Sequence, residues 1–264
     1  MTTKRMQEPT ALADGRRLCP GPAGIAVAAV LALASGLVDA RNPPGAAKAT
    51  PLEFAEVRLI IEFNSTDEDV GVQFFLDVDS WQSVRVVNPA GKEIFDARAR
   101  GNLLQQGGGT EMFVESQEPT LDELSLEEFF ELFPEGTYRF AGRTPDGQRL
   151  TGETEFSHDI PAGPQITLPV AGDECAENVP VPVVIAWNEV TESIDGEPID
   201  IEAYEVIVEG EDVDFDVTMP ANAGTSLTVP AEILEPGTEY DFEVLAIADN
   251  GNQTITETCF VTAD

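Results

Sequence analysis

Basic residues are scarce in this sequence. Lys and Arg total 14 against 49 Asp and Glu, so the formal net charge is -35 at pH 7. No Lys or Arg follows Arg149, whereas acidic side chains continue to Asp264. Nucleic acids and anionic membrane surfaces bind proteins that neutralise their negative charge. The composition therefore excludes both of them as partners.

The residues that common enzyme chemistry needs are also lacking. His158 is the only histidine, and the chain has no Gly-x-Ser-x-Gly turn and no Cys-x-x-Cys motif. Triad hydrolysis and zinc chemistry therefore lack their residues. Carboxylates are so abundant that counting them identifies no glycosidase-like pair. We expect a non-enzymatic protein without a cofactor, in which His158 is a strand-end or linker residue.

Only the N-terminal region has a long apolar run. The stretch from Gly24 to Val38 is apolar, follows a basic segment and precedes a small-residue site at Ala40. It is shorter than the ~20 apolar residues that span a bilayer as a helix. This pattern predicts a secretory signal peptide over residues 1–40. We expect cleavage near Ala40, a secreted or periplasmic protein, and no permanent membrane span.

Cysteine is rare, with Cys19 in the predicted signal peptide and Cys175 and Cys259 after it. Exported proteins meet an oxidising compartment in which thiols usually pair. The sequence therefore predicts a disulfide between Cys175 and Cys259, and two free buried thiols are the alternative.

The acidity of the chain has three explanations: solubility in a saline setting, binding of divalent cations, or a basic partner. The only lysines after the predicted signal peptide are Lys48 and Lys92. This scarcity favours a surface adapted to solvation. A saline habitat is therefore our first hypothesis for the charge.

Residues 41–51 contain Pro43-Pro44-Gly45 and several alanines, and we expect a flexible spacer there. A β-rich domain is predicted over residues 52–160, because apolar residues alternate with polar ones from Val57 to Phe63. Further predicted strands are Val72–Val78, Ser83–Val87, Glu93–Phe95, Thr137–Arg143 and Arg149–Phe156.

Two segments interrupt the strands of this domain. Gly107, Gly108 and Gly109 indicate a mobile loop, since no Gly-Lys-Ser/Thr follows to bind phosphate. Thr120–Phe133 is the one helix that we predict, with Ser125 and Glu128 as its capping box. Residues 161–164, Pro-Ala-Gly-Pro, then predict a domain boundary.

After the boundary, short alternating segments separated by turns are typical of a β-sandwich over residues 165–264. Trp187 ends an early strand, Tyr204 lies in the next, and Leu234-Glu235-Pro236-Gly237-Thr238-Glu239-Tyr240 precedes a later one. These residues resemble the fibronectin type III domains, whose corner tyrosine corresponds to Tyr240. The resemblance implies a two-sheet sandwich in which Trp187, Tyr204 and Tyr240 are structural, within an exported bacterial protein.

The first domain contains a shorter version of the same phrase. Leu132–Phe140 repeats the order of Pro, Gly-Thr and Tyr-x-Phe. It is similar to phrases in bacterial Ig-like and carboxypeptidase-regulatory-like domains. The fold class that we predict is thus all-β, with two sandwich-like domains in tandem, the first with a short helical insertion.

Calcium is the ligand that the acidic turns could take, since hard cations bind carboxylate oxygens. No group of residues has the spacing of an EF-hand loop. Charged strand edges, moreover, more often serve to prevent aggregation. The candidate ligands are Asp67, Asp69, Asp77, Asp79, Asp212, Asp214 and Asp216.

The sequence favours a non-enzymatic exported interaction or structural module that binds an unknown protein or extracellular polymer through loops or sheet edges. A calcium-dependent adhesion or matrix protein is one alternative. An accessory subunit or inhibitor of a separate secreted enzyme is the other.

Overall fold

The computed structural model describes residues 50–170 and 175–264. The predicted signal peptide, its cleavage site and most of the predicted spacer lie outside the described residues. Residues Lys48–Asp264 form one compact unit. Among the described residues, no helix is long and apolar enough to cross a membrane.

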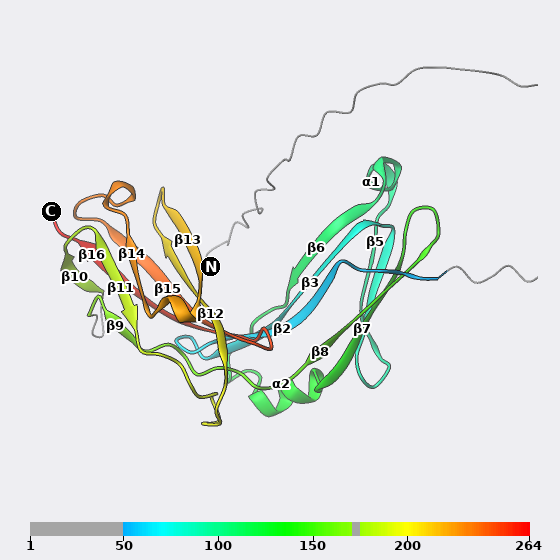
Figure 1. The fold of residues 1–264 in the computed structure, drawn as a ribbon, viewed down its shortest axis with the longest axis horizontal. Coiled ribbons are helices and arrows are strands. Elements are labelled where there is room, and N and C mark those ends of the chain that lie inside the picture. The colour runs from blue at the N-terminus through cyan, green and yellow to red at the C-terminus, as the bar shows by residue number, and fades with distance from the viewer. Residues whose placement is uncertain (1–49, 171–174) are drawn as a thin grey trace, which may run out of the picture. The chain divides into compact units, whose positions relative to one another are not determined.

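The largest sheet has eight strands, and we call it the long sheet. Its strands belong to both predicted domains, and Figure 1 shows β2, β3 and β6 running side by side. In spatial order they are β13 (Asp214–Pro220), β12 (Ile201–Glu209), β15 (Glu239–Ala248), β16 (Gln253–Thr262), β2 (Glu56–Asn64), β3 (Asp69–Trp81) and β6 (Gly109–Glu115), with β10 (Ala176–Val179) also paired to β16.

Two smaller sheets complete the sandwiches. The second sheet has the order β1 (Leu52–Glu53), β8 (Arg149–Phe156), β7 (Gly136–Arg143), β4 (Ser83–Val87) and β5 (Glu93–Arg98). The third sheet has the order β14 (Ser226–Val229), β11 (Val183–Trp187) and β9 (Ile166–Leu168).

Each smaller sheet shares a separate hydrophobic core with part of the long sheet. One core contains Leu59, Phe74 and Phe140, from β2, β3 and β7. The other contains Ile185, Val206 and Val244, from β11, β12 and β15. Alternation of apolar and polar residues puts the apolar side of each strand into one of these cores. The predicted all-β class with two sandwich-like domains is confirmed, while the boundaries at residues 52–160 and 165–264 stay predictions.

The helices differ from the prediction. The helix α2 covers Leu126–Leu132, and its predicted capping box is present, since Ser125 Oγ accepts from Glu128 N and Glu128 accepts from Ser125 N. It does not begin at Thr120, because Thr120 bridges Asp69 instead. A second short helix, α1 (Gly101–Gln106), was not predicted. Short 3-10 helices lie at Ala221–Ala223 and Ala231–Ile233.

The glycine-rich segment is not the mobile loop that the sequence indicates. Gly107 ends α1, and Gly109 begins β6. A Cβ on Gly108 would lie 2.3 Å from the Trp81 carbonyl oxygen, and one on Gly109 would lie 2.6 Å from the Trp81 ring. Gly108 and Gly109 are therefore required for close packing against Trp81, whereas Gly107 has open space around it and a φ of +130°.

The second half has the strand order of a fibronectin type III sandwich: β9, β11 and β14 form one layer, and β13, β12, β15 and β16 form the other. The corner is present, since Glu235 N donates to Tyr240 Oη at 2.8 Å. The predicted disulfide between Cys175 and Cys259 is confirmed. This disulfide joins β16 to the residue just before β10.

The long sheet is continuous because β16 and β2 pair in parallel, with Gln253 opposite Glu62 and Ile255 opposite Asn64. Side chains reinforce this contact. Asn252 Oδ1 accepts from Ile61 N at 2.8 Å, and Ser65 Oγ donates to Ile255 O at 2.7 Å. The two sandwiches thus share one sheet, which the sequence did not predict.

Candidate functional site

Strand register places many carboxylates on one face of the long sheet, the face turned away from both cores. Gln253 and Glu62 are opposite each other, Glu243 is opposite Glu257, and Gln73 is opposite Glu115, so their side chains share that face. We call it the carboxylate face. Its acidic members are Glu56, Glu62, Asp69, Asp77, Glu111, Glu115, Glu205, Glu209, Asp214, Asp216, Glu239, Asp241, Glu243 and Glu257.

One basic residue accompanies these carboxylates in the strands of the long sheet. It is Arg58, whose guanidinium lies 2.6 Å from Glu56 and 5.0 Å from the centre of the Phe75 ring. Coulomb repulsion among carboxylates on one sheet is only partly screened by solvent. Repulsion on the carboxylate face therefore favours the binding of positively charged groups.

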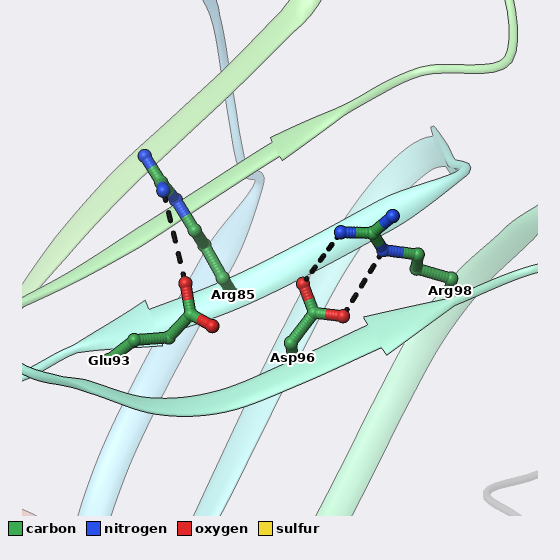
Figure 2. Close-up of polar contacts among 4 residues, drawn as sticks. All are labelled: Arg85, Glu93, Asp96 and Arg98. Carbon is green, nitrogen blue, oxygen red and sulfur yellow. Dashed lines mark hydrogen bonds and ion pairs between the residues drawn. The ribbon is translucent and has the colours of Figure 1, made fainter.

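The second sheet balances its charges differently. All other described Lys and Arg residues lie on or beside it. Arg98 Nε lies 3.2 Å from Asp96 Oδ1. Figure 2 shows this pair and Arg85 beside Glu93 on the neighbouring strand. Arg139 on β7 similarly pairs with Glu153 on β8 at 3.2 Å. We call this outer surface the mixed-charge face.

The tightest acidic cluster lies where β2, β3 and β6 meet. Oxygens of Glu62, Glu115 and Glu118 all lie within 4.8 Å of one another. Gln253 Nε2 donates to Glu62, and Gln73 Nε2 donates to Glu115 at 3.2 Å. This cluster lies beside the pairing of β16 with β2.

Two features allow Glu118 to lie in this cluster: its neighbour Gly71 has no side chain, and its own carboxyl group is protonated. A Cβ at position 71 would lie 2.7 Å from Glu118 Cγ, so glycine is required there. Burial, then the charges of Glu62 and Glu115 and a hydrogen bond with Glu62, raise the pKa of Glu118 to about 8. Glu118 thus holds a proton at neutral pH, and its buried Oε1 has no partner among the described residues.

A second carboxyl pair lies near the opposite edge of the long sheet. Burial, then a hydrogen bond with Asp216 and its charge, raise the pKa of Glu205 to about 7. Thr218 Oγ1 also donates to Glu205 at 3.2 Å. In the cluster and in this pair, burial and neighbouring carboxylates together favour the protonated form of one carboxyl group.

The seven aspartates predicted as calcium ligands lie in three places, which are the start of β3, its later half, and β13 with the turn before it. Asp67 is in the turn after β2, where its N–H donates to Asn64 Oδ1 at 3.1 Å. Asp69 begins β3, and burial followed by the charges of Asp67 and Glu62 raises its pKa. Asp77 and Asp79 lie inside β3 rather than at a strand end, because β3 continues to Trp81.

The other three predicted ligands are on or near β13. Asp214 and Asp216 lie on this edge strand and are exposed, and Asp212 is in the turn before it. None of the seven belongs to the cluster of Glu62, Glu115 and Glu118, whose carboxylate oxygens are the ones among the described residues that lie close enough together to hold a metal ion. The sequence missed that cluster because only the pairing of β2, β3 and β6 brings its members together.

The residues predicted to be structural are buried in the second core. Trp187 and Tyr204 pack edge to face, with ring centres 5.2 Å apart. Tyr204 Oη accepts from Val190 N at 2.9 Å. Tyr240 is 2% exposed and stacks on Phe260. These side chains hold the sandwich and are not available to a ligand.

His158 lies in the segment after β8. Its ring stacks on Phe130 with centres 3.9 Å apart, and its Nε2 is 2.8 Å from Phe133 O. The histidine thus fixes the end of α2 against this segment. The hydrogen bond found for its ring among the described residues is the one to the Phe133 carbonyl, and its backbone N donates to Glu135 Oε1 at 2.9 Å.

No protein-family model and no curated protein matches this sequence. Solved structures are similar at low identity. The FN1–FN3 domains of chicken CNTN1 align with 81% of the chain at 13% identity and a TM-score of 0.34. The chain spans 65% of the length of that structure.

Two further structures align over a similar share of the chain. One is a two-domain fibronectin type III segment of chicken tenascin, with 80% of this chain and 99% of that chain covered at 11% identity and a TM-score of 0.27. Another comes from a 1.5-MDa bacterial ice-binding adhesin, with 81% and 65% covered at 14% identity and a TM-score of 0.26. These scores are too low to transfer a function.

The fold of the second half rests on its own geometry. The strand order of its two layers, the buried Trp187 and the bond from Glu235 N to Tyr240 Oη are the features that the sequence resemblance implies. The strands of the second half therefore have a fibronectin type III-like fold.

Proposed function

We propose that this chain is a non-enzymatic interaction module of an exported protein, and that it binds its partner through the carboxylate face. The observation that carries the proposal is the extent of this face. It runs across both sandwiches on one continuous sheet and contains a single basic residue, Arg58. A broad surface of this kind suits contact with a macromolecule, whereas small ligands are usually bound in concave apolar pockets.

Export is part of the same proposal. The disulfide between Cys175 and Cys259 supports it, because disulfides persist mainly in oxidising compartments. The predicted cleavage near Ala40 is tested by the intact mass of the protein recovered from outside the cytoplasm. A mass that begins at Arg41 and is two hydrogens below the reduced value supports export, and a mass that retains the leader contradicts it.

The partner is found by cross-linking. The full chain is treated with a carbodiimide, which joins carboxylates to amines in contact, together with the extracellular fraction of the source organism. We expect cross-links from exposed members of the carboxylate face, such as Glu111, Glu209 and Asp241, to lysines of one partner. Cross-links confined to the mixed-charge face would contradict the proposal.

Calcium-dependent adhesion is a second candidate, which the cluster of Glu62, Glu115 and Glu118 favours. Calcium binds several carboxylate oxygens at once. Thermal unfolding at constant ionic strength, with calcium and then with excess chelator, is the test. A rise in Tm that magnesium does not reproduce supports this function, and an equal Tm excludes it.

A further inference from the structure

We propose that the free edge of β6 binds an extended partner segment as an added strand, and that the segment carries a basic, an apolar and a basic residue at alternate positions. This inference rests on the proposed function and names the kind of partner. It depends on which backbone groups β6 leaves free and on the side chains beside them.

The free backbone groups follow from the ladder between β3 and β6. Ser116 N donates to Val72 O at 2.9 Å, and Asp77 O accepts from Ala55 N on the other side of β3. Hydrogen-bonded and non-bonded pairs alternate along an antiparallel ladder. The N–H and C=O groups of Glu111, Phe113 and Glu115 therefore point away from β3, at the edge of the long sheet.

The same three residues have their side chains on the carboxylate face. Phe113 is 41% exposed between two carboxylates, opposite Phe75 on β3. A strand added at this edge would place its own alternate side chains beside Glu111, Phe113 and Glu115. Cross-strand pairs of opposite charge and apolar pairs are favourable, so the complementary order is basic, apolar, basic.

Other edges of the described sheets are less suited to strand addition. β10 and β14 have 4 residues each and no large apolar side chain that is exposed. β1 and β9 each have an exposed large apolar residue but contain 2 and 3 residues. β13 ends at Pro220, which discourages pairing, and it has no large apolar side chain that is exposed. β5 has its ion pairs and no large apolar side chain that is exposed. β6 combines 7 residues with an exposed phenylalanine.

A second copy of this chain does not fit the edge. Antiparallel pairing of two β6 strands about Phe113 would place Glu111 of each opposite Glu115 of the other. Like charges directly opposite each other are destabilising. A basic segment of a different protein is therefore the occupant.

The test uses the full chain and a fluorescent peptide, Thr-Lys-Thr-Val-Thr-Lys-Thr, with fluorescence anisotropy at low salt as the readout. Control peptides carry glutamate in place of lysine, or the same residues with the two lysines adjacent. We expect only the first peptide to bind. Its binding should slow hydrogen exchange at the N–H groups of Glu111, Phe113 and Glu115, and unchanged exchange there would overturn the proposal.

Substitutions separate strand addition from general attraction. Glu111→Gln with Glu115→Gln should weaken peptide binding by about fivefold to tenfold, since two opposite-charge pairs are lost. Asp214→Asn with Asp216→Asn removes the same charge from the same face at the other edge, and should leave affinity unchanged. Equal losses in the two variants would mean diffuse charge attraction and would overturn the proposal.

Glu111→Pro tests the backbone directly. Proline removes an N–H that points to solvent, so the ladder with β3 is kept while the added strand loses a donor. We expect no peptide binding with a native thermal unfolding curve. If this variant does not fold, hydrogen exchange in the unmodified chain decides. A partner that cross-links to the carboxylate face while exchange at β6 stays unchanged refutes strand addition and leaves the proposed function intact.

Discussion

The carboxylate face and the mixed-charge face are both outer surfaces of β-sheets, yet they treat charge in opposite ways. On the mixed-charge face, arginines and carboxylates from neighbouring strands pair, as Arg139 does with Glu153. On the carboxylate face, acidic residues neighbour one another, and burial together with these neighbouring carboxylates raises the pKa values of Glu118 and Glu205. The arginines and carboxylates of the mixed-charge face thus pair within the chain, whereas the carboxylate face favours the binding of positive charge from another molecule.

The largest effect that we expect concerns Glu118. Its pKa of about 8 lies above the ordinary value of 4.5, so the folded chain binds more protons than the unfolded chain between these pH values. The stability of the fold should therefore fall as pH rises through this window. Glu118→Gln keeps the neutral form and should gain about 1–2 kcal/mol above pH 8, a figure reduced for solvent screening at a partly exposed group.

Urea unfolding near pH 4.5 and above pH 8 measures this difference. Glu155→Gln, on the mixed-charge face, is the control for loss of one negative charge. If Glu118→Gln and the control changed the pH dependence of the free energy of unfolding equally, the proposed difference between the two faces would be contradicted.

The hydroxyl groups of two buried tyrosines, Tyr138 in the first core and Tyr240 in the second, offer a second contrast between an unpaired and a paired group. Tyr240 Oη accepts from Glu235 N, whereas the Tyr138 hydroxyl is buried without a partner among the described residues. Burial raises the pKa of Tyr138 to about 12. Tyr240→Phe should cost about 1 kcal/mol of stability, and Tyr138→Phe should cost nothing or stabilise the fold.

Thermal unfolding of the two variants measures this pair of effects. Equal losses would show that the hydroxyl of Tyr138 has a partner after all, and an unchanged Tm for Tyr240→Phe would contradict the corner assignment.

The smallest effect should come from the mixed-charge face. Arg139 and Glu153 pair on the surface, with side chains 58% and 59% exposed. Exposed ion pairs contribute little, so a double-mutant cycle with Arg139→Ala and Glu153→Ala should give a coupling of about 0.5 kcal/mol or less. A coupling several times larger would mean that this face, too, depends on its charges.

Local patterns predicted the second half of the chain well. Tyr240 and the Pro-Gly-Thr phrase before it identify a corner. Cys175 and Cys259, the two cysteines after the predicted leader, pair with each other. A similar phrase predicted the sandwich of the first half, which the first core confirms. Leu132–Phe140 repeats the phrase, yet the Tyr138 hydroxyl does not form the corner bond among the described residues.

The carboxylate face could not be predicted because it depends on which strands are neighbours. Alternation along β2 shows that Glu62 points away from the core, but nothing local to β2 indicates that Gln253 will lie opposite it. Likewise, Gly71 leaves room for Glu118 only once β3 and the segment after β6 are paired. The predicted aspartates were chosen by proximity in sequence, and none of them belongs to the cluster that the fold assembles.

The central claim is that the carboxylate face makes the contact with a partner. Titration calorimetry of the cross-linked partner against two variants of equal charge tests it most directly. One carries Glu56→Gln, Glu111→Gln, Glu209→Gln and Asp241→Asn, and the other carries Glu93→Gln, Asp96→Asn, Glu153→Gln and Glu155→Gln. We predict a loss of affinity of about tenfold or more for the first variant and none for the second. Equal affinities of the two variants would contradict the account.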